Sequence, residues 1–167
     1  MRVIVPRSAW AVLTALVAAC SRNPPQREAL LRIQAIHGEA GPWAVAGYRM
    51  GDYALRTLHL PRHSVDLEVV HRSPPMVQFS CIVDGASAAT GASLGKLNLR
   101  WESVDPKKLE TVYRNKKTQE TLVLRPTASF VERFRDLPQK ETADFGRVTM
   151  ALPDEEIFSV GANKPAP

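Results

Sequence analysis

The sequence predicts an α+β domain in which helices pack on a mostly antiparallel sheet. Apolar residues recur at helical spacing between residues 27 and 58, and helical patterns return after residue 128. Between them, residues 65–125 hold short stretches rich in β-branched residues that are separated by turn-forming residues. Helices first, then successive strands, then helices again are typical of the α+β class, in which the sheet is largely antiparallel.

Two helices are expected in the N-terminal part of the domain. The first covers Arg27–Ile36, and the second begins at Pro42, whose fixed φ suits the first helical turn, and runs to Leu58. Gly47 and Gly51 lie on one stripe of the second helix, although each glycine costs about 1 kcal/mol there relative to alanine. We therefore expect another element to pack tightly against this stripe.

The middle and the end of the chain supply the sheet and two further helices. Strands are expected at residues 65–71, 76–82, 97–101, 109–114 and 121–125, of which the last two form a hairpin. Helices are expected at residues 128–135 and 142–152, and a loose tail at residues 161–167. The folded domain should therefore span residues 27–160.

Residues 1–19 have the pattern of a secretory signal. Arg2 and Arg7 give a short positive start, and residues 8–19 form an apolar run. A run of about a dozen residues is too short to span a bilayer but has the length of a signal core.

The residues that end this signal resemble a bacterial lipobox. The sequence LVAAC ends at Cys20, so we expect Cys20 to be lipidated and residues 20–26 to form a tether. The resemblance implies a lipid-anchored protein that faces the periplasm. Ser21 follows the cysteine, and by resemblance to Gram-negative lipoproteins this favours sorting to the outer membrane in a Gram-negative cell. The alternative is a plain signal that happens to precede a cysteine.

Charge and cysteine content exclude several classes of function. The chain carries 22 Lys+Arg against 17 Asp+Glu, and two of the arginines belong to the signal. The remaining excess of basic residues is mild and scattered, which argues against a nucleic-acid partner. Apart from Cys20, Cys81 is the sole cysteine in the sequence, so the mature domain can form no intrachain disulfide.

Residues 81–98 have the most unusual composition in the chain. Residues 85–93 all have small side chains (GASAATGAS), and such residues let another backbone or a ligand come close. We expect this segment to leave a groove open beside the loop at residues 37–42.

The end of this segment superficially resembles a phosphate-binding loop. That motif needs four residues between its glycines and a serine or threonine after its lysine. Here three residues separate Gly91 from Gly95, and Leu97 follows Lys96. No nucleotide cofactor is therefore expected.

Four residues with metal-ligand chemistry flank the expected groove. His37 and Glu39 lie in the loop before the second helix, and Cys81 and Asp84 lie at the end of an expected strand. Imidazole, carboxylate and thiolate bind transition metals, and zinc accepts any mixture of them. Each residue also has an ordinary structural alternative: a loop-capping imidazole, a solvated acid, a small core residue and a helix N-cap, respectively.

Two blocks of the chain resemble the FmdE family, which takes its name from formylmethanofuran dehydrogenase. They are His37-Gly38-x-x-x-Pro42 with Gly47-Tyr48-Arg49-Met50-Gly51, and Cys81-x-Val83-Asp84 with Thr90-Gly91-x-x-x-Gly95-Lys96-x-Asn98-Leu99. The resemblance covers about residues 30–126. It implies an α+β domain, often dimeric, with a groove that holds a metal. We accordingly predict a metal site at His37, Glu39 and Cys81, and ligand-binding residues at Asp84, Thr90, Lys96 and Asn98.

The chain departs from the family pattern at three positions. Glu39 stands where the family has a second histidine, and Gly41 and Ala92 stand where it has cysteines. The cysteine-rich zinc-binding tail of many members also has no counterpart in this sequence. The loss of two thiols from one groove argues against a dithiol redox role and leaves a site made of histidine, carboxylate and one thiol.

These observations predict a membrane-anchored domain that binds a metal ion, with zinc as the first expectation, or a small ligand. The groove would be formed by residues 37–42 and 81–96, and the protein would act as a carrier, a sensor or an accessory protein. One alternative is an enzyme of the same fold, with Asp84 or His37 as general base and Cys81 as nucleophile or metal ligand. Another is a structural lipoprotein whose groove is vestigial. The glycine stripe and the resemblance also predict a homodimer.

Overall fold

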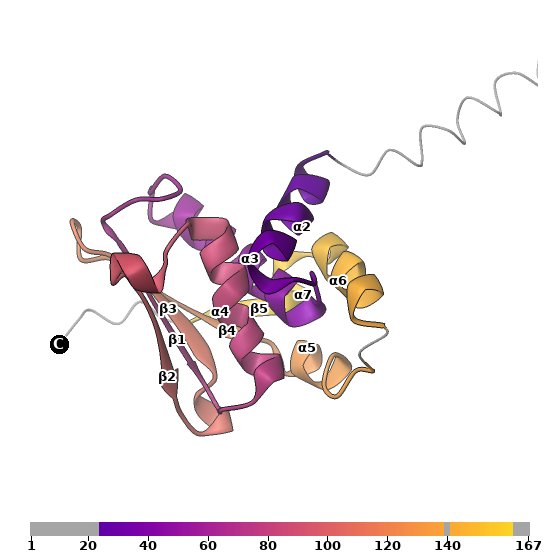
Figure 1. Cartoon of the computed structure of the whole chain (residues 1–167). Coiled ribbons are helices and arrows are strands. Elements are labelled where there is room, and N and C mark those ends of the chain that lie inside the picture. The colour runs from indigo at the N-terminus through magenta and orange to yellow at the C-terminus, as the bar shows by residue number, and fades with distance from the viewer. Residues whose placement is uncertain (1–23, 139–140, 162–167) are drawn as a thin grey trace, which may run out of the picture.

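The computed structural model describes residues 24–138 and 141–161, which form one sheet with helices packed on it (Figure 1). The strands are β1 (Leu67–Ser73), β2 (Leu99–Ser103), β3 (Glu110–Asn115), β4 (Thr121–Pro126) and β5 (Phe158–Gly161). The helices are α2 (Pro24–His37), α3 (Pro42–Thr57), α4 (Val77–Thr90), α5 (Ala128–Arg133), α6 (Thr142–Ala151) and α7 (Asp154–Ile157), with short 3-10 turns η1 (Leu94–Lys96) and η2 (Pro106–Lys108). The predicted α+β class is confirmed.

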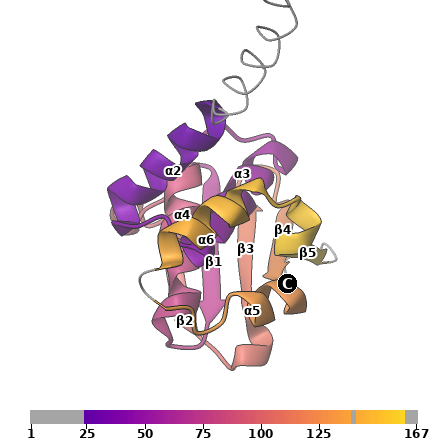
Figure 2. The same cartoon turned by 90° about the vertical axis from the view of Figure 1, so that its right-hand side faces the viewer.

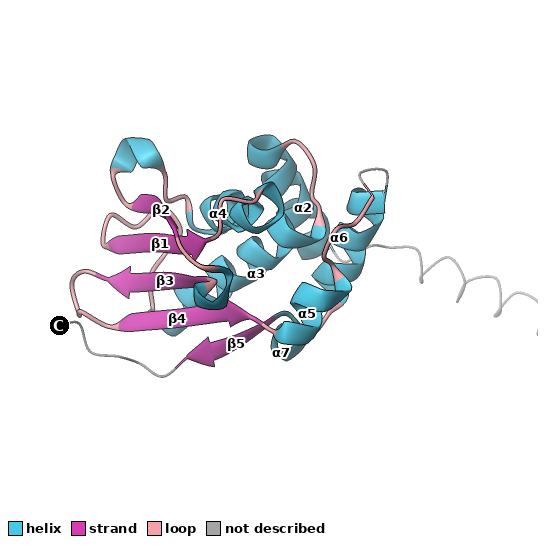
Figure 3. Ribbon diagram, turned by 90° about the horizontal axis from the view of Figure 1, so that it is seen from below, coloured by secondary structure: helices cyan, strands magenta, loops and turns pink. Residues whose placement is uncertain are grey.

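The sheet has the strand order β2-β1-β3-β4-β5, and the longer helices lie on one side of it (Figure 3). Each neighbouring pair is antiparallel except β1 and β2, which run parallel. A parallel pair needs a long crossover connection, and α4 supplies it between β1 and β2. The first part of the sheet is therefore a β-α-β unit. β3 and β4 then form a hairpin, and α5, α6 and α7 connect β4 to β5.

The predicted strand at residues 76–82 is wrong, because Met76 is the N-cap of α4 and residues 77–82 form its first half. A short apolar run with β-branched residues does not by itself distinguish a buried strand from a buried helix. Here the run continues into residues 85–90, whose small side chains make one helix that ends where Gly91 adopts φ 72°. The other four predicted strands are confirmed within a few residues, and β5 was not predicted.

The close contact expected at the glycine stripe of α3 is made by α4. A Cβ atom added to Gly47 would lie 2.1 Å from the carbonyl oxygen of Ile82. In return, a Cβ atom added to Gly85 would lie 1.8 Å from the carbonyl oxygen of Ala44. The two helices thus touch backbone to backbone, so the small residues of α4 fill this space with α3 and leave no groove there.

The helix ends agree with the predicted ones to different degrees. α2 begins at Pro24, inside the predicted tether, because a proline pair is compatible with the first helical turn, where no amide hydrogen is needed. α3, α5 and α6 confirm three predicted helices. The predicted signal, Cys20 and the last six residues of the predicted tail lie outside the described residues. None of the described helices is long and apolar enough to cross a bilayer.

The hydrophobic core lies between the helices and the sheet, whose strands stand behind α6, α4 and α3 in Figure 2. Trp43, at the start of α3, packs edge-on against Phe79 and Phe130 at ring-centroid distances of 4.9 and 5.3 Å. Its indole Nε1 donates a hydrogen bond of 3.0 Å to the carbonyl oxygen of Phe134. A second cluster joins α2, α3, α4 and α6, and both clusters fall within residues 29–158.

Candidate functional site

The loop between α2 and α3 places His37 at the rim of a pocket. α2 ends at His37, and Gly38 turns the chain with φ 87°, a conformation that glycine adopts without strain. Gly41 then precedes Pro42, the first residue of α3. The C-terminal end of a helix favours a cation, so this position suits a protonated imidazole.

Asp84 holds His37 from the neighbouring helix. Cys81 and Asp84 are three residues apart on α4 and therefore share one helix face. His37 Nδ1 lies 2.8 Å from Asp84 Oδ2. The Asp84 carboxylate, and secondarily the Cys81 side chain, raises the pKa of His37 to about 10. At neutral pH the imidazolium therefore donates this hydrogen bond to Asp84.

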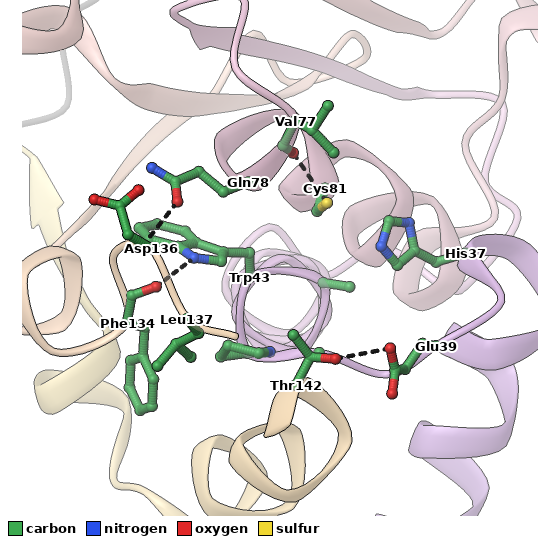
Figure 4. Close-up of a pocket in the computed structure, with 13 residues that line it drawn as sticks. His37, Glu39, Trp43, Val77, Gln78, Cys81, Phe134, Asp136, Leu137 and Thr142 are labelled. Carbon is green, nitrogen blue, oxygen red and sulfur yellow. Dashed lines mark hydrogen bonds between the residues drawn. The ribbon is translucent and has the colours of Figure 1, made fainter. Parts of the chain in front are cut away.

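The Cys81 thiol is partly exposed and points its proton at its own helix. Cys81 Sγ donates a hydrogen bond of 3.0 Å to the carbonyl oxygen of Val77, one turn earlier. The sulfur remains on the pocket surface next to His37 (Figure 4). The thiol, imidazole and carboxylate thus form one contiguous group, which we call the His37 group: His37, Cys81 and Asp84.

Two depressions meet at the His37 group. The less open one has a volume of about 280 Å³ and is lined by His37, Glu39, Gly41, Pro42, Trp43, Ala44, Val77, Gln78, Cys81, Phe134, Asp136, Leu137 and Thr142. A more open one of about 300 Å³ is lined by His37, Val77, Ser80, Cys81, Val83, Asp84 and Trp101. His37, Val77 and Cys81 line both, so a small molecule in either depression would contact the imidazole and the thiol.

A family model described as "FmdE, Molybdenum formylmethanofuran dehydrogenase operon" matches residues 36–159. The chain belongs to the FmdE family. The match begins next to His37 and ends inside β5, so it includes the pocket, strands β1 to β4 and the start of β5. A comparison with curated proteins gives no match.

Glu39 lines the same pocket, and its carboxylate is hydrogen-bonded to the first residue of α6. Its Oε2 accepts a hydrogen bond of 2.7 Å from Thr142 Oγ1 at the start of α6 (Figure 4). The predicted metal set of His37, Glu39 and Cys81 thus lines a single pocket. Among residues 24–138 and 141–161, however, no three His, Cys, Asp or Glu side chains are grouped so that they would hold a metal ion.

Thr90, Lys96 and Asn98, which we predicted to bind a ligand with Asp84, lie at the other end of α4. Thr90 is six residues beyond Asp84, which is about 9 Å along a helix axis. Thr90 Oγ1 donates to the carbonyl oxygen of Ala86 at 2.7 Å, and Asn98 Oδ1 accepts from the amide of Ser93 at 3.0 Å. Lys96 Nζ donates to the carbonyl oxygen of Gly91 at 2.7 Å. Of the predicted ligand-binding residues, the structure brings only Asp84 to His37.

The pocket also contains residues that sequence reasoning missed. Trp43, Phe134 and Leu137 form its apolar wall, and Gln78 and Asp136 close one side, joined by a hydrogen bond of 3.3 Å from the Asp136 amide to Gln78 Oε1. No periodicity connects residues 134–142 with a loop about a hundred positions earlier. The one signal in the sequence was Trp43, which follows Pro42, because a large aromatic residue at a helix start beside the predicted loop can form a pocket wall.

Arg49, the third residue of the Gly-Tyr-Arg motif, fixes the far end of α6 to α3. Its guanidinium donates to the carbonyl oxygens of Met150 and Leu152 at 2.9 Å each and pairs with Asp154 at 2.7 Å. These carbonyls are among those that a helix end leaves without intrahelical partners. Arg49 therefore has a positioning role, because it keeps α6, and with it the Thr142 wall of the pocket, against the rest of the domain.

Proposed function

We propose that this FmdE domain binds a small organic ligand in the pocket beside the His37 group. The observation that carries the proposal is the meeting of a cationic imidazole, a partly exposed thiol and an apolar wall in one pocket of about 280 Å³. Binding pockets combine a mostly apolar lining with a few polar groups that orient the ligand. In this pocket Trp43 and Leu137 would pack against the apolar body of the ligand, and His37 would donate to its polar end.

A metal ion is the second candidate ligand for the same pocket. Zinc binds the neutral form of histidine, so metal uptake would require His37 to release a proton that Asp84 and Cys81 help to retain. This competition supports a small organic molecule as the first candidate. If zinc did bind, His37, Cys81 and Glu39 would supply nitrogen, sulfur and oxygen ligands.

The pocket proposal predicts a defined pattern of thiol reactivity and ligand binding. Protein purified without chelator should contain far less than one zinc per chain, and iodoacetamide should alkylate Cys81. A mixture of small organic acids and amides, screened by saturation-transfer NMR, should contain binders that slow this alkylation. Val77 is 80% exposed and lines both depressions, so Val77→Trp should block the binders and leave the fold intact.

Two outcomes would contradict the small-ligand proposal. Stoichiometric zinc that His37→Gln and Cys81→Ser each release would establish the metal site instead. Binders that remain equally bound to Val77→Trp would show that they occupy another surface.

The His37 group also supports an enzyme as the alternative function. A cysteine beside an imidazolium that a carboxylate orients is an arrangement used for nucleophilic thiolates. In that case Cys81 would attack an electrophilic substrate and His37 would protonate the leaving group. His37→Gln should then slow alkylation of Cys81 by iodoacetamide several-fold, whereas a merely binding pocket would show little change.

We further propose that the domain is a lipoprotein anchored at Cys20 on the periplasmic side of a bacterial membrane, and that it forms a homodimer. The lipobox-like sequence supports the anchor. The dimer rests on the family resemblance, because the glycines of α3 and α4 already pack against each other within one chain. Mass spectrometry of the purified full chain should find a lipidated cysteine at the mature N-terminus. A mature N-terminus at any other residue, without lipid, would contradict the anchor.

A further inference from the structure

One end of the domain gathers basic side chains around the end of α4. Arg62 donates to the carbonyl oxygens of Ala89 and Ala88 at 3.1 and 3.0 Å, and its Nη1 lies 2.6 Å from His63 Nε2. Lys96 Nζ lies 3.4 Å from the other nitrogen of the same imidazole. The three side chains therefore form one continuous basic strip across the helix end.

The hairpin turn between β3 and β4 extends this strip. The amide of Lys116 donates a hydrogen bond of 2.7 Å to the carbonyl oxygen of Asp66, so the exposed Lys116 and Lys117 lie beside the loop that carries Arg62. In the part of the chain that the structure describes, no carboxylate lies within ion-pair distance of Arg62, Lys96, Lys116 or Lys117. The same two loops also carry the carboxylates of Asp66 and Glu120, so the four cations leave this end of the domain with a net positive charge.

Apolar side chains stand exposed among these cations. Leu94 and Leu97 are 73% and 86% exposed, and Val65 is 74% exposed. Leu97 also adopts φ 55°, a conformation that is costly for a branched, bulky residue. The positions of Arg62 and Lys96 are explained by their hydrogen bonds to carbonyl oxygens at the end of α4. Neither capping nor core packing explains why Leu94 and Leu97 are exposed to water, or why Leu97 has a left-handed backbone conformation.

We propose that this end of the domain, defined by Arg62, Val65, Leu94, Lys96, Leu97, Lys116 and Lys117 and called here the α4-end surface, rests on an anionic phospholipid bilayer. Apolar side chains that insert to the depth of the headgroups, surrounded by lysine and arginine that contact lipid phosphates, are the pattern of interfacial membrane binding. The bilayer therefore complements both the charge and the exposed leucines of this surface.

The position of the start of α2 favours a bilayer over another binding partner. This argument depends on the proposed lipid anchor at Cys20. α2 starts at Pro24, four residues after Cys20. In Figures 1 and 2 the start of α2 and the loop after α3 both lie on the upper side of the domain. A lipid on Cys20 would thus hold the domain with this side toward the membrane, and the α4-end surface would limit its rotation about the tether.

The test uses residues 20–167 with Cys20→Ser, so that it does not depend on acylation. Sedimentation with vesicles of phosphatidylethanolamine and phosphatidylglycerol should bind this protein at low salt, and pure phosphatidylcholine vesicles should bind it at least about tenfold more weakly. Leu94→Ser with Leu97→Ser should lower the affinity about tenfold or more. Lys116→Gln with Lys117→Gln should lower it about tenfold and reduce its salt dependence.

The matched control is Leu31→Ser with Val160→Ser, two other apolar residues that are each 53% exposed. This control should bind vesicles like the parent protein, and all variants should keep the parent melting temperature because the altered side chains are exposed. Equal vesicle binding by the parent and the double leucine variant would overturn the proposal. So would an absence of binding to anionic vesicles, or a dimer in light scattering that the leucine changes dissociate, which would identify a second copy as the occupant.

Discussion

Gly85→Ala is expected to lower the free energy of unfolding by about 3 kcal/mol or more, at the upper end of the usual range for overpacking. The added methyl would lie 1.8 Å from the carbonyl oxygen of Ala44 and 2.8 Å from its carbonyl carbon. Both atoms belong to the backbone of α3, so no side chain can rotate away, and the two helices must separate. The gain in helix propensity from glycine to alanine, about 1 kcal/mol, is too small to offset this.

Gly95→Ala is the matched control for this prediction. Gly95 lies in η1, and within the described residues no atom beyond its chain neighbours lies within 4 Å of the position where its Cβ would be. Urea unfolding should therefore give a midpoint close to that of the parent protein for Gly95→Ala and a much lower one for Gly85→Ala. Similar midpoints for the two variants would mean that α3 and α4 do not touch backbone to backbone.

Acidification from pH 6.5 to pH 4 is expected to remove about 3 kcal/mol of stability through His71 alone. Burial lowers the pKa of His71 from 6.5 to about 4. The neutral ring donates from Nε2 to the carbonyl oxygen of Phe79 at 3.1 Å and accepts at Nδ1 from Thr111 Oγ1 at 2.8 Å. The unfolded chain binds a proton near pH 6.5 and the folded chain only near pH 4, so this stability is fully present above pH 6.5 and is lost as the pH falls between these values.

A comparison with His71→Gln isolates the effect of this histidine from that of the carboxylates. Glutamine has an amide that can contact Phe79 but has no charge to gain. Urea unfolding at pH 7 and pH 4.5 should show a larger acid loss for the parent protein than for the variant, although the variant is less stable at pH 7. The same acid loss in both proteins would show that His71 is not buried in its neutral form.

His37 contributes to the pH dependence of folding stability with a sign opposite to that of His71. Its pKa is raised, so the stability from its bond to Asp84 is fully present below pH 6.5 and is lost as the pH rises toward 10. Because the side chains of His37 and Asp84 are 24% and 44% exposed, solvent reduces the size of this contribution. The stability of the domain should therefore pass through a maximum near neutral pH.

Most of the fold could be predicted from local patterns, and the main error shows what such patterns lack. The helical spacing of Gly47 and Gly51, together with the energetic cost of glycine inside a helix, correctly indicated that another element packs against them. The partner turned out to be residues 77–90, which were predicted as a strand followed by an open segment. Local composition did not show that β1 and β2 run parallel, and it is this pairing that requires a crossover helix between them.

The candidate site was predictable in part for a similar reason. His37, Cys81 and Asp84 do converge, but they do so because Cys81 and Asp84 share a face of α4, not because a strand ends there. Thr90 and Asn98 lie at the C-terminal end of the same helix and in the loop after it, where their hydrogen bonds hold the local backbone. The apolar wall from Phe134 and Leu137 depends on how α5 and α6 return to the loop before α3, which no short-range pattern encodes.

The protonation state of His37 tests the proposed site most directly. NMR of the histidine ring nitrogens across a pH series should show His37 still protonated at pH 7 and titrating near pH 10. Asp84→Asn should bring this titration down toward 6.5, because Asp84 is the main cause of the shift. A His37 ring that titrates near 6.5 in the parent protein, and does not respond to Asp84→Asn, would contradict a pocket organised around a cationic imidazole.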